Sequence, residues 1–169
     1  MIISRQVRLS VECAACVLVT GVLCTSAFAS PSEDSCHEAY WDGTKLQDLA
    51  RCKASAESGD AGTEFLYGLI LWSGHDRASD HKTALDWFRK SARQGHGLAR
   101  ISLGGFLSHP EIEQSLRNVP EAYAWYSVAG ARESAAKLRS QMNGRELEQA
   151  KRLVKEFREK YGETTGITK

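Results

Sequence analysis

The sequence has almost no surplus charge, because its 169 residues include 22 basic and 21 acidic side chains. Proteins that hold nucleic acid or anionic lipid by bulk charge need an excess of Lys and Arg gathered on one face. Here the basic residues are scattered along the chain, so we expect no nucleic acid partner. Proline is scarce, with three residues, and 42% of the chain is hydrophobic. This composition is typical of one ordinary globular domain.

The chain also lacks a hydrophobic run long enough to cross a membrane. The apolar stretch 13–29 has 17 residues, whereas a spanning helix needs about 20. Two arginines precede this stretch, and Ala27-Phe28-Ala29 has the small-x-small pattern that signal peptidase accepts. We therefore expect residues 1–29 to be a signal peptide that is cleaved after Ala29, with a retained anchor as the alternative. The protein would then be periplasmic or secreted, without stable membrane insertion after cleavage.

Cleavage would change the cysteine content. Three of the five cysteines lie in residues 1–29, including the Cys13-Ala-Ala-Cys16 pattern, which is thereby excluded as a redox or metal motif. The 140 residues from Ser30 onwards carry 20 basic and 20 acidic side chains and two cysteines, Cys36 and Cys52. Thiols oxidise in an exported protein. We expect one disulfide, worth about 3 kcal/mol by loop entropy, and two free buried thiols are the alternative.

The rest of the chain repeats with a period near 36 residues. Aligned pairs lie 36 apart, or 38 apart after an insertion: Phe65 with Ile101, Gly68 with Gly104, Ala84 with Ala122, Trp87 with Trp125, and Phe88 with Tyr126. The same register extended backwards sets Gly59 under Gly95. We therefore expect one domain over 30–162. It would contain clear repeats over 61–96 and 97–134 and partial repeats over 36–60 and 135–161.

Each repeat has the pattern of two helices. In the first, Asp60 and Asp80 are suitable N-caps, and Gly74 and Gly95 are suitable ends. Glycine in mid-helix costs about 1 kcal/mol relative to alanine, and it occurs at the same position in both repeats. A neighbouring helix is therefore expected to pass too close there for a β-carbon. The residues expected to pack the repeats are Phe65, Gly68, Ala84, Trp87, Gly95, Gly104, Ala122 and Trp125.

A final helix is expected over 145–161. Asn143 and Glu146 resemble a capping box, and apolar residues recur at spacings of three and four along this segment. Its outer face alternates acids and bases, so we interpret it as the helix that closes the stack. A partner-binding or membrane-surface helix is the alternative. Residues 163–169 are expected to form a loose, flexible tail.

Residues 61–96 resemble a Sel-1-like repeat, the helical hairpin related to the tetratricopeptide repeat. The matching positions are Ala61, Thr63, Phe65, Gly68, Gly74, Asp80, Ala84, Trp87, Ser91, Gly95 and His96. The resemblance extends, more weakly, over about 115 residues, and the C-terminal part looks like the end of exported bacterial members of this family. The loop 74–79 lacks the usual Gly-Val-Pro, and the longer segment 108–120 replaces it in the second unit. The single cysteine pair separates this chain from the cysteine-rich subgroup.

The resemblance implies an all-α fold, a short α-solenoid of antiparallel hairpins with about seven helices. It also implies a non-catalytic module that holds a protein or peptide on the concave face formed by the first helices. By helix phase, the outward candidates for partner binding are Glu64, Trp72, Arg100 and His109. We expect a monomeric periplasmic adaptor or scaffold without a cofactor. An envelope inhibitor, such as an immunity protein for a toxin, is the main alternative.

Catalysis and metal binding are weaker alternatives. Ser79 to Lys82 and Ser134 to Lys137 both match Ser-x-x-Lys, which carries the nucleophile of β-lactamase-like serine hydrolases. The companion motifs Ser-Asp-Asn and Lys-Thr-Gly are absent, so we expect no enzyme. The densest group of metal-ligand residue types is His75, Asp76, Asp80 and His81, and its spacing matches no established zinc motif.

Overall fold

The computed structural model describes residues 36–37, 40, 46–74 and 80–164. Within this part the chain forms seven helices and no strand, which confirms the all-α prediction. They are α2 (Leu46–Glu57), α3 (Ala61–Ser73), α4 (His81–Arg93), α5 (Gly97–Ser108), α6 (Val119–Val128), α7 (Arg132–Arg139) and α8 (Gly144–Tyr161).

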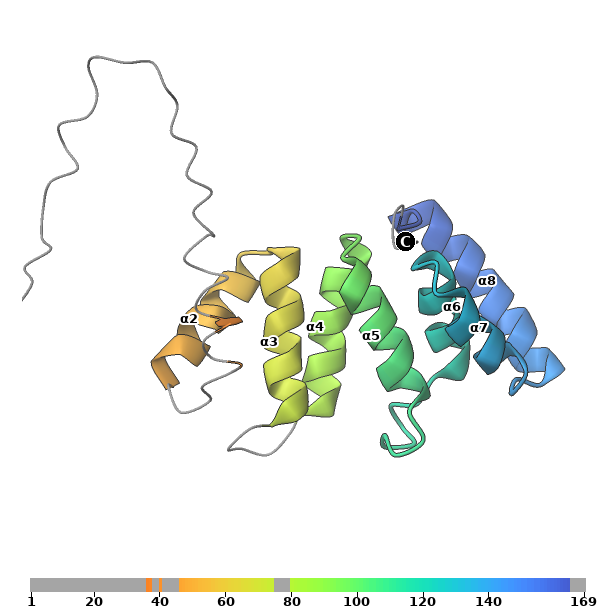
Figure 1. Ribbon diagram of the computed structural model, residues 1–169, viewed down its shortest axis with the longest axis horizontal. Helices are drawn as coiled ribbons and strands as arrows, with labels where there is room; N and C mark the ends of the chain where they lie inside the picture. Colours follow the sequence, from red (N-terminus) through yellow and green to blue (C-terminus); the bar gives the residue numbers. More distant parts are fainter. Residues whose placement is uncertain (1–35, 38–39, 41–45, 75–79, 165–169) are drawn as a thin grey trace, which may run out of the picture.

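Helices α2 to α5 stand side by side in chain order along the long axis of the molecule, and α6 to α8 form its C-terminal end (Figure 1). Each of α3, α4, α5 and α6 packs on the helix before it, so α3–α4 and α5–α6 are hairpins in one stack. The order changes after α6, because both α7 and α8 pack on α6 and pack little on each other. The predicted short solenoid is therefore present, with a different arrangement at its C-terminal end.

The helices begin where the sequence predicted. Asp60 accepts a hydrogen bond from the Thr63 amide at 2.8 Å, and Asp80 accepts one from the Thr83 amide at 2.9 Å. The Asn143–Glu146 capping box is complete. Helix α5 has an N-cap that the sequence analysis did not predict: the Nδ1 atom of His96 accepts a hydrogen bond from the Ala99 amide at 3.2 Å. Each cap satisfies an amide that the helix itself leaves without a partner.

The backbone repeats as the alignment predicted. Gly59 and Gly95 lie 36 residues apart, follow α2 and α4 respectively, and share a φ of +94°. Gly74 ends α3 with a φ of +71°. Because side chains other than glycine rarely adopt a positive φ, these glycines fix where the chain turns between helices.

The core has two parts. The larger part lies between α3 and α8 and includes Phe65, Ala84, Ala122 and Trp125 from the predicted packing set. The smaller part lies at the N-terminal end, where the predicted disulfide joins Cys36 to Cys52. Both cysteines are fully buried and cluster with Tyr67, Ile70 and Trp87. The disulfide is therefore part of the small core at the N-terminal end.

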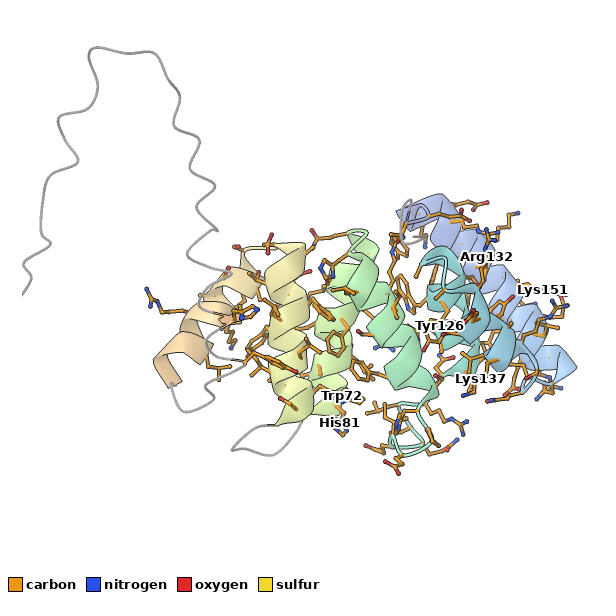
Figure 2. All side chains as sticks on the ribbon, in the orientation of Figure 1. Trp72, His81, Tyr126, Arg132, Lys137 and Lys151 are labelled. Atoms are coloured by element: carbon orange, nitrogen blue, oxygen red, sulfur yellow. A yellow bond between two sulfur atoms is a disulfide. The ribbon has the colours of Figure 1, made fainter. Side chains whose placement is uncertain are left out.

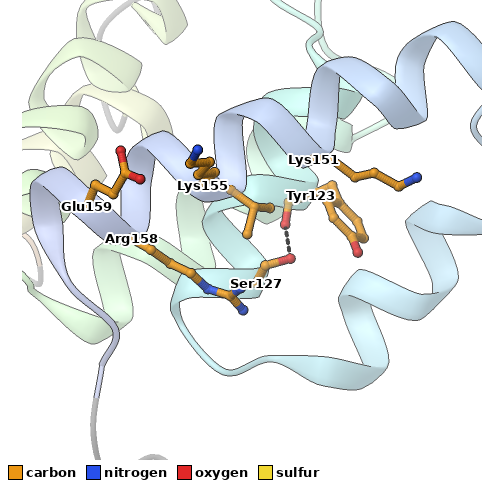
Figure 3. Close-up of a pocket in the computed structure, with 7 residues that line it drawn as sticks. Tyr123, Ser127, Lys151, Lys155, Arg158 and Glu159 are labelled. Atoms are coloured by element: carbon orange, nitrogen blue, oxygen red, sulfur yellow. Dashed lines mark hydrogen bonds between the residues drawn. The ribbon is translucent and has the colours of Figure 1, made fainter.

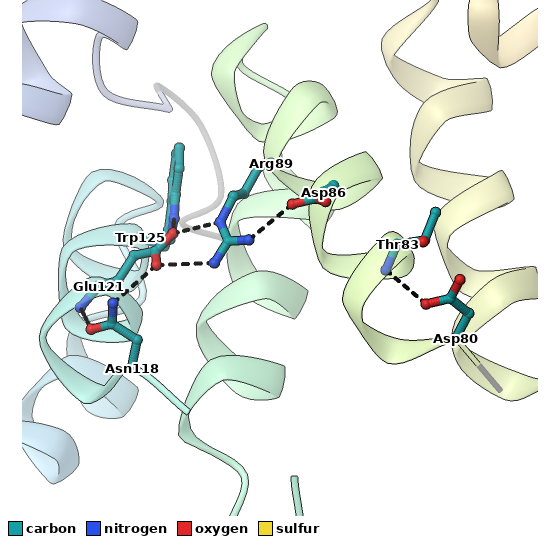
Figure 4. Close-up of polar contacts among 7 residues, drawn as sticks. All are labelled: Asp80, Thr83, Asp86, Arg89, Asn118, Glu121 and Trp125. Carbon is teal, nitrogen blue, oxygen red and sulfur yellow. Dashed lines mark hydrogen bonds and ion pairs between the residues drawn. The ribbon is translucent and has the colours of Figure 1, made fainter. Parts of the chain in front are cut away.

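An ion pair holds the two clear repeats in register. Arg89 of α4 donates from Nε and Nη2 to the two carboxylate oxygens of Glu121 of α6, at 2.9 and 3.1 Å (Figure 4). The same carboxylate accepts hydrogen bonds from Trp125 Nε1 at 3.2 Å and Asn118 Nδ2 at 3.3 Å. The hydrogen bonds that Arg89 donates to Glu121 are the main reason that the pKa of Arg89 is raised. Paired forks of this kind fix orientation as well as distance.

Residues 163 and 164, expected to belong to a loose tail, contact the helical stack. Thr164 donates its amide to the Val128 carbonyl at 2.9 Å, and Glu163 pairs with Arg158 at 2.5 Å. Residues 162–164 therefore lie against the ends of α6 and α8, whereas residues 165–169 are outside the described part. The expected signal peptide, residues 1–29, is outside it as well. Among the described helices, none is both long and apolar enough to cross a membrane.

Candidate partner-binding surface

Two of the four predicted partner-binding residues are buried, which corrects their placement on the surface. Glu64 is 4% exposed and Arg100 is 1% exposed. Helix phase placed both side chains outward, but each has polar partners inside the stack. Glu64 accepts a hydrogen bond from Gln94 Nε2 at 2.7 Å, and burial raises the pKa of its carboxyl group.

Arg100 connects the ends of two helices. Its guanidinium donates to the carbonyl oxygens of Ala92 at 2.9 Å, Tyr161 at 2.6 Å and Gly162 at 3.0 Å, and to Thr164 Oγ1 at 2.9 Å. These carbonyls lie at the C-terminal ends of α4 and α8, where helix dipoles place partial negative charge. Burial lowers the pKa of Arg100. The side chain joins α4, α5 and α8 and is inaccessible to a partner.

Trp72 is half-buried and serves mainly in packing. Its ring stacks on Phe106 of α5 at a centroid distance of 3.9 Å and on His81 of α4 at 4.3 Å. Figure 2 shows Trp72 and His81 together at one end of the α3–α4 hairpin. Phe106 also stacks on Phe88 at 5.0 Å. This aromatic column ties the first repeat to the second.

His109 is the one exposed member of the predicted set. It follows α5 and lines a hollow of about 520 Å³ together with Tyr126, Ser134 and Lys137.

The ring of Tyr126 also lies against Gly104, where an added β-carbon would be 2.9 Å from Tyr126 Cδ1. The predicted close approach at Gly104 is thereby confirmed.

A second surface, which the sequence did not reveal, lies at the C-terminal end. A hollow of about 460 Å³ lies between α6 and α8, and Figure 3 shows its lining side chains. Helix α6 supplies Tyr123 and Ser127. Helix α8 supplies the other side chains: Lys151, Val154, Lys155, Arg158 and Glu159.

Another hollow, of about 350 Å³, adjoins the hollow between α6 and α8. The two share Tyr123, Ser127 and Arg158. Helix α7 forms its other wall with Arg132, Ala135, Ala136 and Arg139, and Tyr126, Gly130 and Glu163 complete the lining. We call the two hollows together the α7–α8 groove. Tyrosines of α6 form its floor, and its two walls come from helices that pack little on each other.

The walls of the α7–α8 groove are mostly cationic. Lys151 pairs with Glu148 at 2.7 Å, and Arg158 pairs with Glu163. Arg132, Arg139 and Lys155 make no ion pair with any other residue in the described part of the chain. Three cations of the groove or its rim are therefore without an ion-pair partner among the described residues, although Glu159 lines the same hollow as Lys155.

The overall neutrality of the sequence hides this charge. Residues 30–131 hold 10 basic and 14 acidic side chains, whereas residues 132–161 hold 9 basic and 5 acidic ones. The two segments thus differ in sign, which a count of charge by segment would have revealed. The expectation that basic residues are merely scattered is wrong for α7 and α8.

The structure also places one of the two Ser-x-x-Lys motifs. Ser134 and Lys137 line the hollow beside Tyr126, whose hydroxyl interacts with Ser108 and Ser134. Burial raises the pKa of the Tyr126 phenol above its ordinary value. Lys137 is exposed to solvent. Ser79 of the other motif lies outside the described residues, as do His75 and Asp76, and no metal-ligand cluster occurs within the described part.

No known family model matches this chain, and no curated protein matches it. Among solved structures, it is similar to the crystal structure of c5321, a protective antigen present in uropathogenic Escherichia coli strains that displays an SLR fold. The TM-score is 0.64 at 21% sequence identity, and the match covers 79% of this chain and 31% of that one. SLR denotes the Sel-1-like repeat. The chain therefore has the Sel-1-like repeat fold that the motif in residues 61–96 predicted.

Proposed function

We propose that this protein is a non-catalytic interaction module of the cell envelope, an adaptor or scaffold that holds a protein or peptide. The observation that carries the proposal is the α7–α8 groove. It is a hollow in which three cations have no ion-pair partner among the described residues. In the described part, every buried side-chain nitrogen and oxygen has a hydrogen-bond partner. The interior is thus fully used for folding, and recognition falls to the surface, as in other repeat stacks.

Two observations support export to the periplasm. Residues 1–29 have the pattern of a cleavable signal peptide, and Cys36 and Cys52 form a buried disulfide of the kind that persists in oxidising compartments. The mass of the protein recovered from a periplasmic fraction tests this directly. We expect a mature N-terminus at Ser30 and one disulfide, whereas a cytoplasmic protein that retains residues 1–29 would contradict export.

The interaction role is tested by affinity capture from a periplasmic extract, with identification of every protein that co-purifies. Each partner is then purified and its binding measured with the isolated protein. A scaffold predicts several partners of moderate affinity, and an envelope inhibitor predicts one tight partner whose activity is blocked. A monomer that binds no captured protein would contradict both roles.

A serine hydrolase is the competing class, and one assay separates it from an interaction module. We expect no turnover of the chromogenic β-lactam nitrocefin by the purified protein. Turnover that disappears in Ser134→Ala or Ser79→Ala, and survives in the matched control Ser140→Ala, would show that the protein is an enzyme. Ser140 follows α7 and lies outside the hollows described above.

A further inference from the structure

We propose that the α7–α8 groove binds an acidic, extended segment of a partner protein. This inference rests on the proposed interaction function and gives it a location and a ligand chemistry. Three properties of the groove indicate this ligand: its shape, the spacing of its cations and its charge.

The shape of the groove suits a narrow ligand. Helices α7 and α8 both pack on α6, so their facing sides form two walls over a common floor. The wall from α7 includes the small side chains Ala135 and Ala136, and the wall from α8 includes Val154. Tyr123 lines both hollows and offers a ring and a hydroxyl. A single peptide chain can contact both walls and the floor together.

The cations lie in two rows at helical spacing. On α7, Arg132 and Arg139 are seven residues apart, and on α8, Lys151, Lys155 and Arg158 span the same interval. At about 1.5 Å per residue, each row is about 10.5 Å long. An extended chain covers that distance in about three residues and directs successive side chains to opposite sides. Successive side chains of a bound segment can therefore reach opposite walls.

The charge of the groove selects carboxylates. Arg132, Arg139 and Lys155 have no acidic partner in the described part of the chain, and an arginine fork accommodates a carboxylate with two parallel hydrogen bonds. Glu159 and Glu163 also line the groove, but Glu163 is already paired with Arg158. A flat anionic membrane fits poorly because the tyrosine floor lies recessed between two helices. A membrane, a nucleic acid and a second copy of this chain are the rival occupants.

The first test measures binding of a defined probe. The probe is a fluorescein-labelled octapeptide in which pairs of consecutive glutamates alternate with pairs of serines, so that glutamates face both walls. Its fluorescence anisotropy is followed as purified protein is added. We expect saturable binding that weakens as salt is raised, because exposed charges are screened. The same peptide with glutamine in place of glutamate should bind at least about tenfold more weakly. Equal binding of the two peptides would overturn the proposal.

The second test locates the site. The double variant Arg132→Glu/Lys155→Glu reverses one unpaired cation on each wall. The control Arg145→Glu/Arg152→Glu makes the same change in net charge at exposed positions of α8 that do not line the groove. We expect a loss of affinity of at least about tenfold in the groove variant and less than about threefold in the control. Equal losses would show a long-range charge effect and would overturn the groove as the site. Melting temperatures of both variants confirm that they fold.

The rival occupants are tested in parallel. Tighter association with phosphatidylglycerol vesicles or a single-stranded oligonucleotide than with the acidic peptide would overturn the proposal. Salt-sensitive dimers that the groove variant abolishes would overturn it as well.

Binding of the captured partners distinguishes a failure of this inference from a failure of the proposed function. A partner that binds the wild type and the groove variant equally leaves the interaction function intact and shows that the groove is not its binding site. If no captured protein binds, the interaction function itself fails, whatever the peptide does.

Discussion

The ring of Phe88 fills the space that a β-carbon on Gly68 would need, because an ideal Cβ there would lie 2.7 Å from Phe88 Cε1. The second repeat has the same arrangement, with Tyr126 in place of Phe88 and Gly104 in place of Gly68. A glycine in the first helix and an aromatic ring in the second thus set the distance between the helices of each hairpin. The mid-helix glycines cost helix propensity, and close packing against the ring offsets that cost.

Gly68→Ala should therefore destabilise the protein. Overpacking of a core site costs about 1–3 kcal/mol, and alanine's advantage in helix propensity recovers only about 1 kcal/mol of it. Thermal unfolding followed by circular dichroism measures the change. The control is Gly144→Ala at the start of α8, where an added β-carbon would meet nothing within 4 Å, so this variant should be neutral or slightly more stable. An unchanged melting temperature in Gly68→Ala would contradict the packing argument, and partial rescue by Phe88→Leu would support it.

Arg100→Ala should destabilise the C-terminal end of the stack in particular. The change removes the hydrogen bonds from the guanidinium to the carbonyl groups of Ala92, Tyr161 and Gly162, and a hydrogen bond to a charged group contributes about 1.5–3 kcal/mol. We expect a loss of about 3 kcal/mol or more in urea unfolding, together with faster hydrogen exchange at the end of α8. Arg93→Ala is the control, because Arg93 is exposed in the last turn of α4. If the two variants unfold at the same urea concentration, Arg100 does not hold the two helix ends.

Local signals predicted most of the fold. Asp60, Asp80 and Asn143 act as caps through bonds to amides three residues away, and such short-range chemistry is visible in sequence. The repeat alignment carried longer-range information, because Gly68 and Phe88 recur as Gly104 and Tyr126 at matching positions. Where a motif recurs, its packing recurs as well.

The site could not be predicted in the same way. Helix phase gives the direction of a side chain but not what lies there, and Arg100 points toward residues 161–164, more than sixty positions later. The α7–α8 groove depends on both helices packing on α6, an arrangement outside the repeat alignment. Its charge was visible in residues 132–161, but the neutral total concealed it.

Removal of the disulfide should weaken the N-terminal end. Cys36 and Cys52 are fully buried in the small core with Tyr67 and Trp87, and the bond closes a loop with a sequence separation of 16. Cys36→Ser/Cys52→Ser should lose about 3 kcal/mol by loop entropy. Chemical unfolding of this variant, compared with the wild type with and without dithiothreitol, measures the loss. Equal stability in all three samples would mean that the bond contributes nothing to folding.

Glu64→Gln should change how stability depends on pH. Burial raises the pKa of Glu64 in the folded state above its ordinary value of 4.5, so the folded protein binds a proton more readily than the unfolded chain. Stability linked to this group is therefore present below pH 4.5 and is lost as pH rises through the folded pKa. Glutamine can still accept the hydrogen bond from Gln94 but does not ionise. The melting temperature of the variant relative to wild type should rise from pH 4.5 to pH 7, and a constant difference would contradict this.

His96→Asn should have the opposite dependence. Burial lowers the pKa of His96 below its ordinary value of 6.5. Its ring lies against Phe65 at a centroid distance of 5.0 Å, and its Nδ1 atom accepts the Ala99 amide hydrogen. The unfolded chain therefore binds the proton more readily, and stability linked to this group falls as pH drops below 6.5. Asparagine is a good N-cap that does not titrate in this range. The variant should thus lose less stability than the wild type between pH 6.5 and pH 5.

The control for this prediction is His109→Asn, which changes an exposed histidine after α5. The melting temperatures of the wild type, His96→Asn and His109→Asn are compared at the same pH values, so that the effect of removing a histidine elsewhere is measured separately. Parallel profiles for His96→Asn and the wild type would show that the N-cap of α5 does not sense pH. A profile that flattens only in His96→Asn would place the acid sensitivity of the stack at the junction between its two repeats.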